Sequence, residues 1–180
     1  MTREQARNNL RDMIVLSLFA AMMVMSDQLM NFLPNIHLIA MFIILLTRFY
    51  RAKALISIYL FVILDGIIEG FFLSTWIMYA YIWALLWLWV MILPKKIPRF
   101  LQAGIYPILG ALHGITFGLF TAPVSYFMFF PGTHSLSGFL AYVASGLPFD
   151  IAHMIGNFCA CILVLPILEM MLKLRSKKLI

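Results

Sequence analysis

The polar residues that could do chemistry in this chain lie inside long apolar segments. In the last of these segments Asp150, His153 and Asn157 are spaced by three and four residues, so a helix would carry them on one face. Pro148 suits the first turn of that helix, which would put Asp150 at the positive end of the helix dipole. Polar groups inside a membrane segment are costly and indicate a ligand or ion pathway. The alternative is that Asp150 only caps the helix, while His153 and Asn157 only bond neighbouring helices.

A second polar pair lies in the third apolar segment. Asp65 and Glu69 are four residues apart and share one helical face. Two neighbouring acids repel each other unless one is protonated or meets a cation. The pair therefore predicts a partner, which could be His113, His153 or a hydrogen-bond donor on a ligand.

Aromatic residues crowd the fourth apolar segment. Trp76, Tyr79 and Trp83 fall on one helical face, which suits stacking on a flat heteroaromatic ligand. The alternative is a belt of aromatic side chains at the membrane interface. Trp87 and Trp89, toward the other end of the segment, fit the belt better.

Motifs of several enzyme classes are missing from the sequence. It contains no G-x-S-x-G, no H-E-x-x-H and no Walker sequence, so we expect no catalytic residue of these kinds and no cofactor. Cys159 and Cys161 are two residues apart in an apolar helix and point to different sides. Metal ligation by His113, Asp150 and His153 is disfavoured because the two histidines are on different segments and nothing fixes their geometry. We therefore expect no metal site.

Composition defines the class of protein. Of 180 residues, 64% are hydrophobic and 11% charged, and the mean hydropathy is +0.99. These values predict an all-α integral membrane protein with a single membrane domain over residues 1–180. The net charge of +6 comes from residues in loops and at the termini, so it reports topology and predicts no nucleic-acid partner.

Six membrane spans are predicted. They cover about residues 13–33, 36–47, 54–73, 74–93, 101–126 and 149–172. Residues 136–147 are too few to span and contain Ser and Gly, so an outer loop is expected there, with room for a short surface helix. Lys and Arg cluster before the first span, after the second, after the fourth and after the sixth, which predicts that both termini are cytoplasmic.

This topology gives each polar residue a depth. Asp27, Gln28 and Asn31 fall at the outer end of the first span, and His37 at the outer start of the second. The other polar residues also fall in outer or middle parts, which predicts one cavity open to the outside above an apolar plug. The residues expected around it are Asp65, Glu69, Trp76, Tyr79, His113, Asp150, His153 and Asn157.

The whole pattern resembles a known family, the substrate-binding S-components of bacterial energy-coupling factor (ECF) vitamin transporters. The resemblance covers the entire chain: six spans, an outward pocket and no ATPase motif. Its most specific local features are the stretches 64–70 (LDGIIEG) and 146–153 (GLPFDIAH). The family docks on its membrane partner through small residues in span one, commonly Ala-x-x-x-Ala. Here Ser17, Ala20 and Ala21 form a relaxed version of that pattern.

The resemblance implies a function. An S-component sits in the bacterial plasma membrane, binds a water-soluble vitamin from outside, and joins a transmembrane coupling subunit and two cytosolic ATPases. It is not itself an enzyme. Thr2 replaces the histidine of nickel and cobalt members, which argues against a metal substrate. Cobalamin is the first expectation, followed by pyridoxine, pantothenate, thiamine or its pyrimidine precursor.

Two other classes of function stay open at the level of sequence. One is a membrane-embedded enzyme that uses Asp150 and His153 as an acid-base pair. The other is a scaffold protein whose polar residues only join helices and which binds no small molecule.

Overall fold

The described part of the chain folds into helices. The computed structural model describes residues 2–33, 35–129, 134–177 and 179, with the backbone alone at Ser74. Over these residues no strand is formed. The helices are α1 (Arg3–Met30), α2 (Ile39–Tyr50), the short 3-10 helix η1 (Arg51–Lys53), α3 (Ala54–Glu69), α4 (Leu73–Ile92), α5 (Arg99–Phe129), α6 (Leu136–Cys161) and α7 (Val164–Ser176).

Four stretches are long and apolar enough to cross a membrane. They are Arg3–Met30, Thr75–Ile92, Arg99–Phe129 and the combined stretch Leu136–Ser176 of α6 and α7. The helices α2 and α3 have 12 and 16 residues, fewer than the roughly 20 that a bilayer requires. The fold is thus all-α over the described residues and consistent with a membrane protein.

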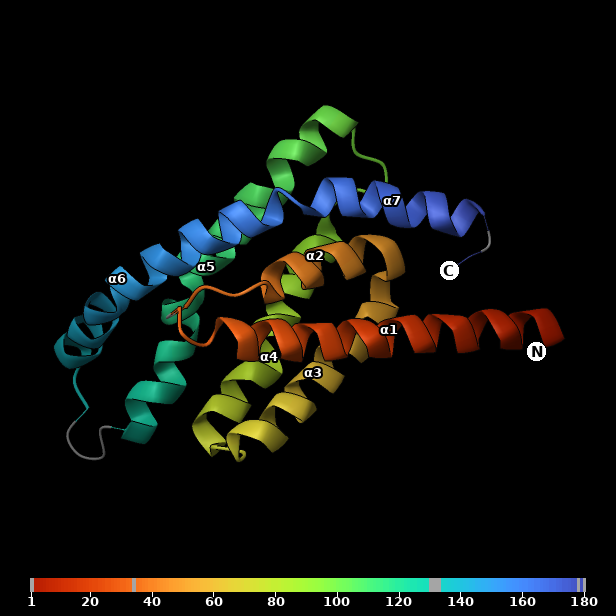
Figure 1. The fold of residues 1–180 in the computed structure, drawn as a ribbon. Helices are drawn as coiled ribbons and strands as arrows, with labels where there is room; N and C mark the ends of the chain where they lie inside the picture. The colour runs from red at the N-terminus through yellow and green to blue at the C-terminus, as the bar shows by residue number, and fades with distance from the viewer. Residues whose placement is uncertain (1, 34, 130–133, 178, 180) are drawn as a thin grey trace.

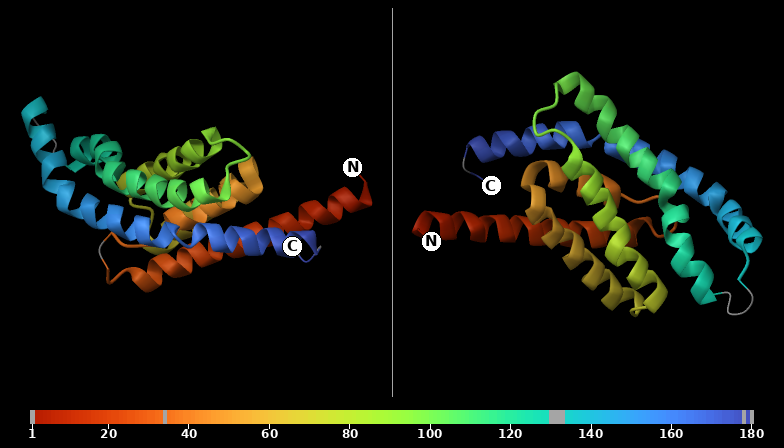
Figure 2. Two further views of the ribbon diagram at one scale, coloured as in Figure 1. Left: turned by 90° about the horizontal axis from the view of Figure 1, so that it is seen from above. Right: turned by 180° about the vertical axis from the view of Figure 1, so that it is seen from behind.

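The short helix α2 lies at the centre of the molecule. Every residue of α2 except Arg48 is buried, because α1, α3, α4, α5, α6 and α7 all contact it. Figure 1 shows α2 between α1 and α7, with α3 and α4 leading away from it. A helix that is apolar on all sides needs this kind of enclosure. The helices α5 and α6 pack against each other along their length (Figure 2).

Both termini lie at one end of the molecule, and the turn between α3 and α4 lies far from them (Figure 1). Polar contacts join the basic segments of the first end. Arg48 donates to the carbonyls of Pro94 and Lys95, at 2.9 and 3.0 Å. Lys53 pairs with Asp12 at 2.6 Å.

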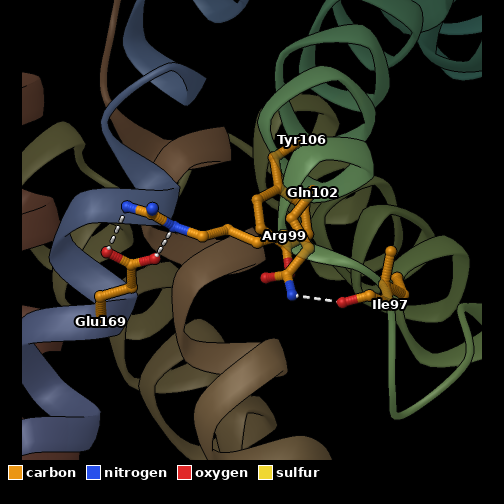
Figure 3. Close-up of polar contacts among 5 residues, drawn as sticks. All are labelled: Ile97, Arg99, Gln102, Tyr106 and Glu169. Carbon is orange, nitrogen blue, oxygen red and sulfur yellow. Dashed lines mark hydrogen bonds and ion pairs between the residues drawn. The ribbon is translucent and has the colours of Figure 1, made fainter.

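An ion pair fastens the start of α5 to α7 at this same end. Arg99 Nη2 donates to Glu169 Oε2 at 3.1 Å, and Arg99 Nε donates to the other carboxylate oxygen (Figure 3). On the neighbouring turn of α5, Gln102 Nε2 donates to the carbonyl of Ile97 at 2.7 Å. Arg99 thereby fixes the start of α5 to α7, and Gln102 fixes the end of the connection between α4 and α5 to α5 itself.

The structure corrects the prediction of an outer loop, with at most a short surface helix, at residues 136–147. These residues form the first half of α6, capped by Ser135, whose Oγ accepts from the N–H of Gly138 at 3.0 Å. Phe139 and Tyr142 of this half pack on Tyr126 of α5, with ring centroids 5.6 and 5.7 Å apart. This tertiary contact stabilises a helix that local composition did not indicate.

The predicted start and end of the last span are also corrected. Pro148 lies inside α6, not in its first turn, so Asp150 is neither a cap nor close to a helix N-terminus. The predicted span 149–172 is interrupted where α6 ends and α7 begins, at Ile162 and Leu163. Pro166 explains the interruption, because it lacks the N–H that would bond the carbonyl of Ile162.

Candidate functional site

A cavity of about 170 Å³ opens where α1 ends, α3 ends and α4 begins. It lies at the end of the molecule that carries the α3–α4 turn, away from the basic end (Figure 1). Its lining is polar on the α1 and α3 sides and aromatic at the turn and on α4. The lining residues are Asp27, Asn31, Asp65, Gly66, Glu69, Phe71, Phe72, Thr75, Trp76 and Tyr79.

The turn after α3 builds the aromatic wall of this cavity. Gly70 adopts φ +86° and Phe71 φ +50°, and the N–H of Phe71 bonds the carbonyl of Gly66 at 2.7 Å, as in a Schellman cap. The turn folds Phe71 back against Trp76, with ring centroids 5.5 Å apart. Gly66 leaves the space for this, since a Cβ there would lie 2.6 Å from the Phe71 ring. A positive φ is unfavourable for a bulky residue, and such strain concentrates at ligand sites.

Three carboxylates surround the same cavity. Asp65 is only 4% exposed, and its Oδ1 has no hydrogen-bond partner in the described part of the chain. Glu69 is exposed, and its Oε1 accepts from Gln28 Nε2 at 3.1 Å. Asp27 projects from α1 on the opposite side. No Lys, Arg or His occurs among the lining residues, all of which belong to the described ranges.

A second cavity of about 150 Å³ adjoins the first and shares Asp27, Asn31 and Tyr79 with it. Its other walls include His37, from the connection between α1 and α2, and His153 of α6. The two imidazole rings are 4.7 Å apart. His37 Nδ1 and His153 Nε2 are buried, and no described residue bonds to them, so a ligand could hydrogen-bond to either.

Trp83 and His113 lie behind these cavities. Trp83 is 1% exposed and His113 is fully buried. Their rings are 5.5 Å apart, and each is also close to Phe117, at 5.7 and 5.8 Å. His113 Nε2 is 3.3 Å from the carbonyl oxygen of Ile82. Neither residue lines the cavities, so both support the wall from behind.

Asp150 joins α6 to α5. Its Oδ1 accepts a hydrogen bond from the backbone N–H of Gly118 at 3.0 Å, and its side chain is 6% exposed. A Cβ on Gly118 would clash with this carboxylate. Asp150 lines neither cavity. Its position fits the alternative in which the polar residues of this segment have a structural role. Asp150 fills that role by bonding α5 and not by capping its own helix.

A row of glycines on α5 makes this approach possible. A Cβ on Gly114 would lie 2.6 Å from the backbone nitrogen of Met154, and one on Gly110 2.5 Å from Cys161 Sγ. Gly110, Gly114 and Gly118 repeat every four residues, the small-residue pattern of close membrane-helix packing. Asn157 is fully buried near this seam, and neither of its side-chain polar atoms has a partner within the described ranges.

The structure therefore divides the predicted site residues into two groups. Asp65, Glu69, Trp76 and Tyr79 line the first cavity and His153 the second. The other predicted site residues are packed in the interior and do not line either cavity: His113, Asp150 and Asn157.

Sequence reasoning left Asp27 and Asn31 out of the predicted site, although both line the two cavities. The signal was present: they are polar residues four apart in an apolar segment, the same pattern that singled out Asp65 and Glu69. Phe71 and Phe72 were also missed. Their position at the cavity depends on the turn after α3, and the spacing of residues along a helix does not predict that turn.

The predicted docking residues of α1 face different directions. Ser17 and Ala21 are exposed, on the side of the helix that carries Leu18 and Met25. Ala20 is fully buried in the core and does not belong to that exposed face. Docking through α1 would therefore involve Ser17 and Ala21 alone of the three.

No three His, Cys, Asp or Glu side chains within the described part of the chain are arranged to hold a metal ion. Comparison with protein-family models, with curated proteins and with solved structures finds no match for this chain. The fold and the site thus define a class only: an all-helical protein of membrane type with a polar and aromatic cavity at the end opposite its basic residues.

Proposed function

We propose that this protein is the substrate-binding S-component of an ECF-type transporter in the bacterial plasma membrane, importing a water-soluble vitamin. The observation that carries the proposal is the pair of adjoining cavities. They combine acidic, imidazole and aromatic groups, and they lie opposite the basic end of the molecule. In this proposal the chain binds ligand without transforming it, and a transmembrane coupling subunit with two cytosolic ATPases drives import.

The proposed topology has six spans and two cytoplasmic termini. It rests on the basic residues of the termini, of η1 and of residues 95–99, which belong to one end; Lys and Arg favour the cytoplasmic side. The helices α2 and α3 would be shorter spans, sheltered by the longer helices around them. The cavities would then open to the outside, where an imported vitamin is captured.

The size of the cavities favours a small ligand. Their volumes are about 170 and 150 Å³, and typical pockets for drug-sized ligands have roughly 300–1,000 Å³. A ligand of one or two rings fits the two spaces together. Cobalamin, the first expectation from the resemblance, is far larger, so the proposal moves to pyridoxine, pantothenate, thiamine or its pyrimidine precursor.

The geometry gives less support to the other functions. An enzyme that used Asp150 and His153 as an acid-base pair would need both groups at its substrate, yet Asp150 lies outside both cavities and is bonded to Gly118. A scaffold would have no use for an open cavity with unpartnered groups at Asp65 and His153, since unpaired buried polar groups destabilise a fold.

The test is to identify a bound molecule and then to measure its uptake. Native mass spectrometry of the protein purified from vitamin-rich cells should detect a co-purified vitamin. Cells that also express a coupling subunit and ATPases should accumulate that vitamin in an ATP-dependent manner. A protein that carries no small molecule and supports no uptake would contradict the proposal.

A further inference from the structure

The first cavity has a distinctive charge. It is lined by the carboxylates of Asp27, Asp65 and Glu69, and no cationic side chain of the described residues lines it. Like charges that share a small site repel one another, and each is stabilised by an opposite charge. Gln28, which donates a hydrogen bond to Glu69, supplies a neutral amide and balances none of this charge.

Asp65 provides a second, independent indication of a ligand. The residue is only 4% exposed and lines the cavity, and its Oδ1 has no hydrogen-bond partner among the residues that the structure describes. A buried carboxylate oxygen without a donor is costly. A donor supplied by a ligand in the cavity would remove that cost.

The aromatic wall suits the same kind of ligand. Phe71, Trp76 and Tyr79 line the cavity together with the carboxylates, and Trp76 is not buried, with 39% of its surface exposed. Aromatic faces attract cations and stack on flat rings. A cavity lined by both carboxylates and aromatic rings therefore matches a compact aromatic cation.

We infer that the ligand of this cavity is a small aromatic cation, whose positively charged nitrogen or N–H groups face Asp65 and Glu69 and whose ring lies against Trp76. The inference rests on the proposed function and narrows it. Among the vitamins considered, it favours a cationic heteroaromatic molecule such as thiamine over a neutral one such as pyridoxine, and it excludes the anion pantothenate.

The experiment uses the purified full-length protein and four probes: thiamine and pyridoxamine as aromatic cations, pyridoxine as the neutral counterpart of pyridoxamine, and pantothenate as an anion. Pyridoxamine and pyridoxine differ by an aminomethyl against a hydroxymethyl group, so they isolate the charge. Equilibrium titration should show the cations binding about tenfold to a hundredfold more tightly than pyridoxine, as a charged hydrogen bond predicts. Pantothenate should not bind.

Variants test whether the carboxylates cause the preference. Asp65→Asn should reduce the preference for pyridoxamine over pyridoxine by about tenfold or more. Glu69→Gln alters an exposed side chain and should lower the preference in the same direction, which covers the case that Asp65→Asn fails to fold. Glu4→Gln, exposed near the N-terminus, removes one negative charge far from the cavity and should leave the preference unchanged.

The outcomes separate this inference from the proposed function. No binding of either cation, equal affinity for pyridoxamine and pyridoxine, or a preference that survives both Asp65→Asn and Glu69→Gln overturns the inference. A neutral or anionic co-purified vitamin overturns it too, but keeps the transporter proposal intact. A protein without ligand and without uptake rejects both.

Discussion

The carboxylate of Asp150 accepts a hydrogen bond from the backbone N–H of Gly118, with 3.0 Å between Oδ1 and N. The contact forms at a point of α5 where any side chain would collide with that carboxylate. A buried acid thus joins two membrane-type helices through a glycine. Of the polar residues on one face of α6, Asp150 packs against α5, whereas His153 lines the second cavity. This division leads to the first two predictions.

Gly114→Ala should destabilise the protein, because the new Cβ would lie 2.6 Å from the backbone nitrogen of Met154. Backbone cannot move aside as a flexible side chain can, so we expect a loss of about 1–3 kcal/mol or more. Thermal unfolding of the detergent-purified variant measures it. Gly104→Ala is the matched control in the same helix: nothing lies within 4 Å of its Cβ, so its stability should stay equal or rise. Equal losses in both variants would contradict the close-packing account.

Asp150→Ala should lower stability and leave ligand affinity nearly unchanged. The change removes a hydrogen bond to a charged group, worth about 1.5–3 kcal/mol, but no cavity wall. Unfolding and ligand titration of the same sample give both numbers. The polar stripe of the last apolar segment predicted a binding role for Asp150, so a large loss of affinity in a variant of normal stability would restore that prediction.

Trp76→Leu should weaken ligand binding by about tenfold, because an aromatic pair contributes roughly 0.5–1.5 kcal/mol beyond its buried area and Trp76 lines the first cavity. Trp89→Leu makes the same change in the same helix, at a residue that lines neither cavity. Titration with the co-purified ligand compares the two. If Trp76→Leu binds as tightly as the unchanged protein, the ring is an interfacial aromatic and not part of the site.

The proposed orientation predicts which introduced cysteines a membrane-impermeant thiol reagent can reach in intact cells. In a protein with Cys159 and Cys161 replaced by Ser, Ser137→Cys should react and Lys96→Cys should not, although both positions are exposed. The positive-inside preference places Lys96 on the cytoplasmic side. After the cells are opened, Lys96→Cys should react as well. Reaction at Lys96→Cys alone in intact cells would reverse the orientation.

Ala21→Trp should prevent association with the coupling subunit and stop uptake, because small residues permit close approach of two helices and Ala21 is exposed on α1. Ligand binding by the isolated chain should persist. Met22→Trp, at a residue 50% exposed and turned about 100° from Ala21 around the helix, should leave association intact. Co-purification with the partner subunits provides the measurement. Loss of ligand binding together with association would indicate misfolding and remove the support for docking at Ala21.

The sequence by itself determined the class of protein and most of its helices. Long apolar runs must place their side chains in the protein interior or in lipid, so the helical segments around residues 54–69, 73–92 and 99–129 could be predicted. The predicted and observed ends of these helices agree to within four residues. The pair Asp65 and Glu69 and the face of Trp76 and Tyr79 could also be recognised, since i, i+3 and i, i+4 spacing is a local property of one helix.

Only the tertiary structure decided the rest of the site. His153 reaches a cavity and Asp150 does not, although both are on one helical face, because the Asp150 carboxylate bonds the N–H of Gly118 on α5 while the His153 ring lies against His37. Asp27 joins Asp65 and Glu69 through the packing of α1 on α3, and residues 136–147 are helical because Tyr126 of another helix packs on them. Spacing along a chain fixes which side chains share a helix face. Which faces meet depends on contacts between residues far apart in sequence. How closely two helix backbones approach at a glycine depends on the residues of the partner helix.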